Sequence, residues 1–277
     1  MDYSDVVLLS DLDGTLFNSD GLISGQNRAA ISEFCENGGL FGVATGRAPY
    51  NARQFLKGVM LNAPSIVFNG AAMYDYAQNA YFGETRFVNV GALDCLIRQC
   101  LEERPNINIQ VYTPDEIAYI SSPETADADF LSIHQPCRFL SYEDSLRLRW
   151  IKSLLFGTPA ETEWIDSRIA ELGLEKRVSF VHSSTDIVPN AQYVELMPLS
   201  VNKGAALDGL KKHPLLKGRT FIAAGDYWND AEMLRSADVS VVPENAPEGV
   251  RALADRVGPS NNGHLAAHII KNIIPEL

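Results

Sequence analysis

Short apolar runs, each followed at once by a polar cluster that contains a glycine, constrain the fold of this chain more than any other feature. Residues 6–10 and 40–44 are two such runs, and residues 65–69 form a third. Apolar side chains at helical spacing fill the intervals 27–37 and 49–58. Runs of this kind are typical of strands that are covered on both faces. Their β-α-β-α-β order predicts a doubly wound parallel sheet.

The middle of the sequence departs from this pattern, because helical stretches at 90–103 and 159–172 are interleaved with strands that have no regular crossover order. The β-like stretches are residues 107–112, 117–121, 150–156 and 177–182. This mixture predicts a separate α+β unit.

The first pattern resumes with a predicted helix at 203–210 and a buried strand at 220–224. Neither flank alone has enough strands to close a sheet. We therefore expect an α/β core domain made of residues 1–82 and 194–277, with residues 83–193 inserted as a cap domain.

Charge and composition narrow the classes of partner. The formal net charge of −12 repels nucleic acid and anionic membrane surfaces, so we expect neither as a partner. The first ten residues lack the basic start of a signal peptide, and no apolar run approaches the ~20 residues of a membrane span. The four cysteines show no CxxC spacing, which favours reduced thiols and a cytoplasmic location.

Two polar clusters follow neighbouring predicted strands. Asp11 and Asp13 come directly after the run 6–10 and turn at Gly14, so both carboxylates can reach one small ligand. A charged loop with an Asx turn is the competing interpretation. Thr45 and Gly46 follow the second run and offer a hydroxyl and a closely approaching backbone amide, although such a pair is commonly a helix cap.

Two further clusters lie after the insertion. Lys203 begins a predicted helix, where an ammonium and backbone amides would bind phosphate together; alone, it is a solvated charge. Asp226, Asn229 and Asp230 follow the strand 220–224 and offer the oxygen ligands that Mg²⁺ prefers, or else an acidic helix cap. If the four clusters meet at one sheet edge, they assemble carboxylates for a metal and donors for a phosphate.

These clusters carry a resemblance to a known family. The sequence resembles the haloacid dehalogenase-like phosphatases, and among them the Cof-type subgroup, in which a large cap is inserted after the third strand of a Rossmann-like core. The matching segments, in family order, are Asp11-Leu12-Asp13-Gly14-Thr15, Thr45-Gly46-Arg47, Lys203-Gly204 and Gly225-Asp226-Tyr227-Trp228-Asn229-Asp230.

The resemblance implies a role for each matching residue. Asp11 is the nucleophile that becomes an aspartyl-phosphate and also a magnesium ligand, and Asp13 is the general acid and then the base. The Asp13 backbone carbonyl and Asp226 complete the protein ligands of Mg²⁺. The phosphoryl oxygens are held by Thr45, Gly46, Lys203 and Asn229. Asp230 orients Lys203 or a metal-bound water.

The resemblance also implies a phosphoric monoester hydrolase whose substrate is a small phosphorylated metabolite, with sugar phosphates as the leading class. A phosphosugar mutase that uses the same Asp11 and a non-catalytic phosphosugar sensor are the alternatives. No GxxxxGK[ST] or GxGxxG string is present, so nucleotide-triphosphate hydrolysis and dinucleotide binding are poorly supported. The sequence assigns no role to Arg47 or to Asn245, which lies where the subgroup has Gly-Asn-Ala, and it does not indicate the oligomeric state.

Overall fold

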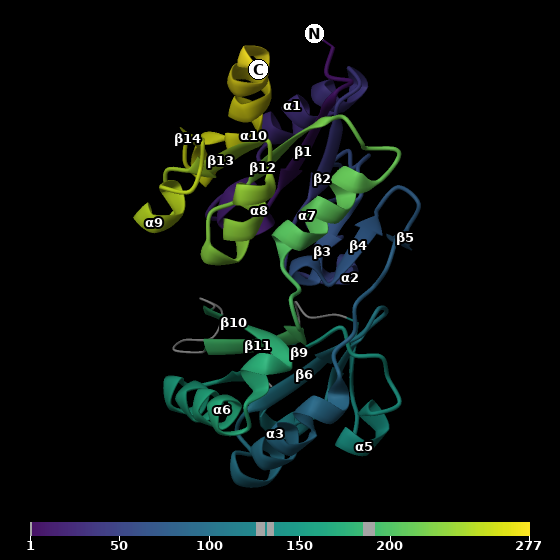
Figure 1. Ribbon diagram of the computed structural model, residues 1–277, viewed down its shortest axis with the longest axis vertical. Coiled ribbons are helices and arrows are strands. Elements are labelled where there is room, and N and C mark those ends of the chain that lie inside the picture. Colours follow the sequence, from purple (N-terminus) through teal and green to yellow (C-terminus); the bar gives the residue numbers. More distant parts are fainter. Residues whose placement is uncertain (1, 126–130, 132–135, 185–191) are drawn as a thin grey trace. The chain divides into compact units, whose positions relative to one another are not determined.

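The computed structural model describes residues 2–125, 131, 136–184 and 192–277. The chain forms two compact units. The first, which we call the core unit, consists of Met1–Glu84 and Asn202–Leu277, and the second, the inserted unit, is Thr85–Val201 (Figure 1).

The core unit contains a five-stranded sheet in the order β14-β13-β12-β1-β2, and every neighbouring pair is parallel. The predicted doubly wound parallel sheet is thereby confirmed. The strands are β1 (Val6–Ser10), β2 (Leu40–Val43), β12 (Thr220–Ala224), β13 (Val239–Pro243) and β14 (Arg256–Gly258).

Helices cover both faces of this sheet (Figure 1). Because side chains alternate along a strand, Leu8 of β1 packs with Ile31 on one face and Leu9 packs with Leu207 on the other. Each fully buried side chain of this size contributes roughly 1.5–3 kcal/mol. The first face carries α1 (Gly25–Glu36) and α10 (Leu265–His268), and the second carries α7 (Lys203–Lys212) and α8 (Ala231–Ser236).

The third predicted strand exists but does not extend the parallel sheet. Residues 65–67 pair antiparallel with the next strand. Their contacts with the β2 segment include an isolated bridge between Ala44 and Ile66 and a bond from Val43 N–H to Ser65 Oγ at 3.0 Å. The chain reverses at Asn69 and Gly70, whose φ angles of 53° and 99° lie in the left-handed region. The resulting small sheet consists of β3 (Ser65–Val67), β4 (Ala72–Asp75) and β5 (Ala80–Phe82).

The helix predicted over 49–58 was too long. The observed α2 is Pro49–Ala52, and beyond it Phe55 N–H donates to Ala52 O and Leu56 N–H to Arg53 O, which is the spacing of turns. These turns place both apolar side chains against the core formed with α1. A further short helix, α9, spans Glu248–Arg251.

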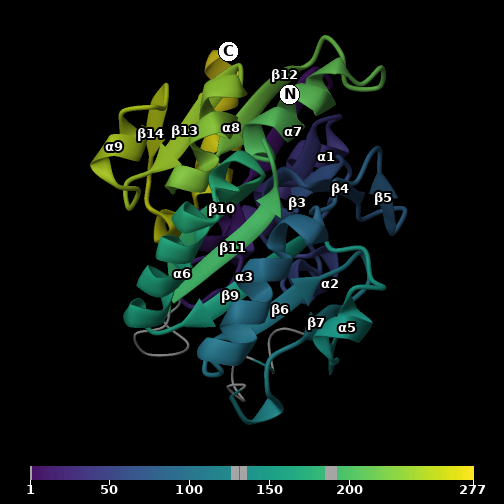
Figure 2. The same cartoon turned by 60° about the horizontal axis from the view of Figure 1, so that its bottom comes forward.

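The inserted unit contains a six-stranded sheet in the order β10-β11-β9-β6-β7-β8, antiparallel except for the pair β7 and β8. Figure 2 shows α3 and α6 lying over this sheet. The strands are β6 (Asn108–Tyr112), β7 (Ile117–Tyr119), β8 (Cys137–Phe139), β9 (Lys152–Gly157), β10 (Val178–Ser184) and β11 (Gln192–Pro198). The helices are α3 (Val90–Glu103), α5 (Tyr142–Ser145) and α6 (Pro159–Glu171).

The expected domain boundary between residues 193 and 194 falls inside β11. This strand pairs with β10 on one side and β9 on the other, so its hydrogen bonds hold it in the inserted unit up to Pro198. Across the described ranges, no helix has both the length and the apolar character that a bilayer crossing requires.

Candidate active site

Asp11 lies at the carboxyl end of β1, the edge where parallel sheets bind ligands. Its backbone N–H donates to the carbonyl of Ala224 at the end of β12, 2.8 Å away. Its side chain is buried, with 6% of the residue exposed. The sheet therefore fixes the start of the polar loop next to the loop that follows β12.

The turn after Asp11 contacts the side chain of Asp226. Gly14 has a φ of 74°, and a β-carbon there would lie 2.3 Å from Asp226 Oδ2, so no other residue fits without displacing this carboxylate. Thr15 Oγ1 donates to Asp226 Oδ1 at 2.8 Å. The Asp-Gly-Thr sequence is thus explained by its contact with a residue more than 200 positions away.

Lys203 is fully buried at the first position of α7. Its Nζ donates to Asp11 Oδ1 at 2.9 Å and to Asp230 Oδ1 at 2.6 Å. Gly204 allows α7 to approach α8 closely, because a β-carbon there would lie 2.6 Å from the backbone of Glu232. The helix contact therefore delivers the ammonium group into the carboxylate cluster.

Asp230 uses both of its carboxylate oxygens within the protein. Oδ1 accepts from Lys203, and Oδ2 accepts from the backbone N–H groups of Asp226 at 3.0 Å and Tyr227 at 3.2 Å. The side chain is fully buried. Asp230 therefore holds both the ammonium group and the loop that carries Asp226.

Negative charge exceeds positive charge in this cluster. Carboxylate oxygens of Asp11, Asp226 and Asp230 lie within 4.8 Å of one another, with Lys203 as their bonded ammonium. Burial, reinforced by Asp230, raises the pKa of Asp11 well above its ordinary value against the opposing effect of Lys203. Burial likewise raises the pKa of Asp226 to about 6, although the Thr15 hydroxyl opposes it.

Lys203 is charged despite its burial. Desolvation disfavours its ammonium form, but the carboxylates of Asp11 and Asp230 outweigh that effect and raise its pKa. Lys203 is therefore a fixed positive charge beside the Asp11 carboxylate.

Thr45 and Gly46 follow β2, and Asn69 links them to the loop after β12. Thr45 is buried, and its Oγ1 accepts from the N–H of Arg47 at 3.1 Å. A β-carbon on Gly46 would lie 2.9 Å from Asn69 Nδ2, and Asn229 Nδ2 donates to Asn69 Oδ1 at 3.3 Å. Sequence analysis gave Asn69 no site role, although the residue ends the predicted strand 65–69.

Asp13 is exposed and forms an ion pair with Arg47. Its two oxygens accept from Arg47 Nη2 at 2.7 Å and from Nε at 2.8 Å. The guanidinium carbon lies 4.9 Å from the ring centroid of Phe55, which stacks against it. Arg47, to which the sequence assigned no role, is therefore the partner of the predicted general acid.

A sequence profile of the haloacid dehalogenase-like hydrolases matches residues 8–270, which is nearly the whole chain. The chain belongs to this family. Two curated relatives from Bacillus subtilis support the expected phosphoric monoester hydrolase. 5-amino-6-(5-phospho-D-ribitylamino)uracil phosphatase YcsE is 27% identical, with 93% of this chain and 91% of that protein covered. Phosphatase YwpJ is 26% identical, with 95% and 98% covered.

The fold also matches that of other haloacid dehalogenase-like hydrolases. The crystal structure of one from Bacteroides thetaiotaomicron superimposes with a TM-score of 0.80 at 23% identity, covering 96% of this chain and 98% of that chain. In the present haloacid dehalogenase-like hydrolase, Lys203 is in direct contact with Asp11 and Asp230, and the N–H of Asp226 donates to Asp230.

The donor set fits a hard divalent cation. Magnesium binds carboxylate and carbonyl oxygens, and Asp11 and Asp226 supply the former. In the described part of the chain, Oδ2 of Asp11 and Oδ2 of Asp226 accept no hydrogen bond, whereas both Asp230 oxygens do. Asp11 and Asp226 therefore fit the role of ligands, and Asp230 fits that of their support.

Four polar or aromatic residues of the inserted unit are candidates for contact with the leaving group, namely Tyr112, His134, Arg138 and His182, and three of them have a protein partner. Tyr112 is buried and its hydroxyl donates to Gln110 at 2.8 Å. Arg138 pairs with Glu116 at 2.6 Å, and His182 with Asp166 at 3.2 Å. The fourth, His134, lies outside the described residues.

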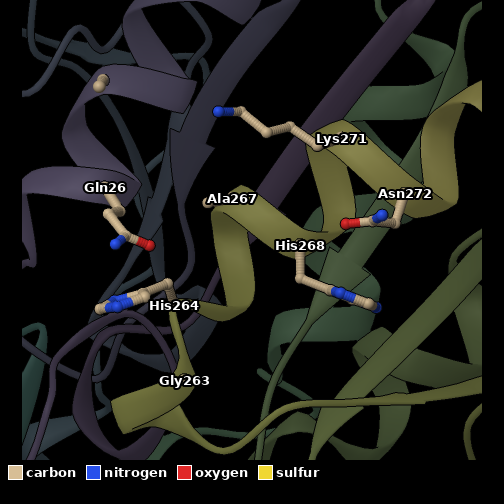
Figure 3. Close-up of a pocket in the computed structure, with 8 residues that line it drawn as sticks. Gln26, Gly263, His264, Ala267, His268, Lys271 and Asn272 are labelled. Carbon is tan, nitrogen blue, oxygen red and sulfur yellow. The ribbon is translucent and has the colours of Figure 1, made fainter.

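A surface hollow of about 350 Å³ lies between α1 and the C-terminal helix, away from this cluster (Figure 3). It is lined by residues that include Gln26, His264, His268 and Lys271, and by none of the predicted site residues. The hollow is therefore not the candidate active site.

Proposed function

We propose that this chain is a magnesium-dependent phosphatase that hydrolyses small phosphate monoesters through an aspartyl-phosphate on Asp11. The observation that carries the proposal is the buried Asp11 carboxylate, which is held by Lys203 and lies within a cluster of surplus negative charge. Such a cluster is costly to bury unless a further positive charge joins it.

The nucleophilic step uses Asp11. In the proposed reaction one oxygen of its carboxylate attacks phosphorus, a bond forms between that oxygen and phosphorus, and the ester oxygen leaves with the electron pair of the broken bond. Lys203 and Asn229, together with Thr45 and the Gly46 amide, hold the phosphoryl oxygens. When bound by Asp11, Asp226 and the Asp13 carbonyl, Mg²⁺ would reduce repulsion between the carboxylate and the phosphate dianion.

Asp13 moves the proton in this proposal. It protonates the leaving alcohol and then takes a proton from the water that hydrolyses the aspartyl-phosphate. A carboxylate in a bidentate pair with arginine accepts hydrogen bonds and donates none. Asp13 therefore has to separate from Arg47 before it can deliver a proton.

The substrate class is that of small phosphorylated sugars or polyols. The name of the YcsE relative gives a phosphorylated ribitylamino compound as its substrate, which supports this class. The net charge of −12 disfavours nucleic acid and anionic membranes as partners. We place the reaction in the cytoplasm.

A panel of phosphate monoesters tests the proposal. Wild-type protein with Mg²⁺ should release inorganic phosphate, whereas Asp11→Asn should lower the rate by roughly 10⁴-fold or more. Chelation of the cation should stop the wild-type reaction. Equal rates for the two proteins would refute the mechanism, and isomer formation without phosphate release would indicate a mutase.

A further inference from the structure

The turn that follows Asp11 makes few hydrogen bonds of its own. Leu16 N–H donates to Asp11 O at 3.3 Å, and Phe17 N–H donates to Leu12 O at 2.8 Å. Between them, Asp13 and Gly14 have non-helical backbone angles. The orientation of the intervening peptides therefore depends on contacts from elsewhere in the chain.

Asn245 supplies one such contact from the loop after β13. Its Nδ2 donates to the carbonyl of Gly14 at 2.9 Å, and its Oδ1 accepts from the N–H of Asn261 at 2.9 Å. The two bonds fix both ends of the side-chain amide. Since Thr15 follows in the same peptide and holds Asp226, the amide of Asn245 also governs where Thr15 lies.

Residues 261–267, which follow β14, continue these contacts. Asn261 Nδ2 donates to Phe17 O at 2.9 Å, and Ala267 N–H donates to Asn27 Oδ1 at 3.0 Å. Leu265 packs in the same core as Leu12, which anchors the segment. Figure 3 shows His264, the residue before α10, beside Gln26 of α1.

We infer that Asn245, held by Asn261, is a positioning residue for the phosphoryl-transfer reaction: it fixes the Gly14 peptide and thereby the relative places of Asp11 and Asp226. The inference rests on the proposed function for its kinetic consequence. Its structural part is independent of that function, because the hydrogen bonds exist in the protein alone.

Asn262 provides a matched control. It is an exposed asparagine next to Asn261. It makes two bonds of the same kind: its Nδ2 donates to Ser19 Oγ at 2.8 Å, and its Oδ1 accepts from Ser19 N–H at 3.0 Å. Ser19 lies beyond the turn, so the Asn262 bonds attach the loop without touching the Gly14 peptide. Asn245 is also exposed, so its replacement by alanine leaves the core packing unchanged.

Amide hydrogen exchange, with neither cation nor substrate added, tests the structural part. In Asn245→Ala, the amides of Leu16 and Phe17 should exchange roughly tenfold faster than in wild type, whereas Asn262→Ala should leave them unchanged. Unchanged exchange in Asn245→Ala would overturn the inference, whether or not the protein hydrolyses phosphate esters.

Steady-state kinetics test the consequence. Asn245→Ala should lower kcat about tenfold and change the substrate KM by less than about twofold, the pattern of a loss confined to the transition state. In Asn262→Ala, kcat and KM should each stay within about twofold of the wild-type values. Equal losses of kcat in the two variants would contradict a positioning role, and absence of turnover in wild type would instead refute the proposed function.

Discussion

Each of the two units buries a lysine among acidic groups, and the two sites differ in charge balance. In the core unit, Lys203 bonds to Asp11 and Asp230, and the carboxylate of Asp226 lies nearby. In the inserted unit, Lys152 pairs with Glu195 at 2.9 Å and lies over the ring of Tyr112. The pair of Lys152 and Glu195 is balanced in its own two charges, whereas the core cluster carries excess negative charge.

This difference separates a pair of equal and opposite charges from a cluster that needs a further cation. A balanced buried pair can be replaced by apolar residues at little cost, whereas a surplus of buried carboxylate stays unfavourable until a positive charge joins it. The surplus lies at the carboxyl ends of parallel strands, where ligands bind. The comparison therefore favours the core unit as the location of the active site.

Removal of the core lysine has the largest expected effect. Lys203→Met leaves the buried Asp11 and Asp230 carboxylates without their ammonium, so the free energy of unfolding should fall by about 3–5 kcal/mol. The turnover of the remaining folded protein should fall by roughly 10²–10³-fold, because a donor to the phosphoryl oxygens is lost. Urea unfolding measures the loss of stability, and phosphate release measures the loss of turnover. Wild-type turnover would exclude Lys203 from the chemistry.

The balanced pair should respond differently to replacement. Lys152→Met alone leaves Glu195 buried and should also cost about 3–5 kcal/mol, but Lys152→Met with Glu195→Leu should recover most of that loss. Urea unfolding of the single and double variants tests this. If the double variant is no more stable than the single, the buried charge of Glu195 is not the cause of the loss.

The pH dependence of stability should reveal the surplus charge. The folded-state pKa of Asp226 is about 6, above the ordinary 3.8, so the folded protein binds more protons than the unfolded chain between these values. Without a divalent cation, the free energy of unfolding should therefore fall by on the order of 2–3 kcal/mol as the pH rises from about 4 to about 6.

Added Mg²⁺ should abolish this fall, because the cation favours the ionised carboxylates. Urea unfolding across this pH range, with and without Mg²⁺, provides the measurement. Identical profiles in both conditions would show that the cation does not bind at Asp226.

The smallest expected effect is at the exposed ion pair. Arg47→Ala removes the partner of Asp13, and because solvent screens both groups, the free energy of unfolding should change by less than about 1 kcal/mol. Thermal unfolding measures the change. A loss of several kcal/mol would mean that the pair is a structural element comparable with the buried ones.

Local patterns predicted the elements that depend on local interactions. The run at residues 6–10 forms β1, and the segment 90–103 with helical spacing forms α3. Both were predictable because the apolar run and the helical periodicity are patterns of residues that are close in sequence. The helix from Pro49 was overestimated, since contacts of Phe55 and Leu56 with the core outweigh helix propensity there. The expected domain boundary fell inside β11 because the extent of this strand depends on its pairing with β9 and β10. Pairing between strands cannot be predicted from the local sequence.

The site could be predicted only as far as its clusters follow strands. The rule that parallel strands share an edge was enough to expect Asp11 and Asp226 together, and the structure places their oxygens within one cluster. Asn69 ends the predicted strand 65–69, but this rule does not say which residue it contacts. The sequence likewise does not pair Asn245 with Gly14. The bonds of Asn69 and Asn245 join residues 160 and 231 positions apart, so they follow from the loops' tertiary arrangement.

The most direct test of the central claim is the binding of Mg²⁺ itself. Calorimetric titration above pH 6 should show one bound Mg²⁺ in the wild-type protein, the same binding in Glu195→Gln of the balanced pair, and none in Asp226→Asn. Retention of wild-type binding by Asp226→Asn would contradict the claim that the surplus carboxylates of the core unit form the cation site.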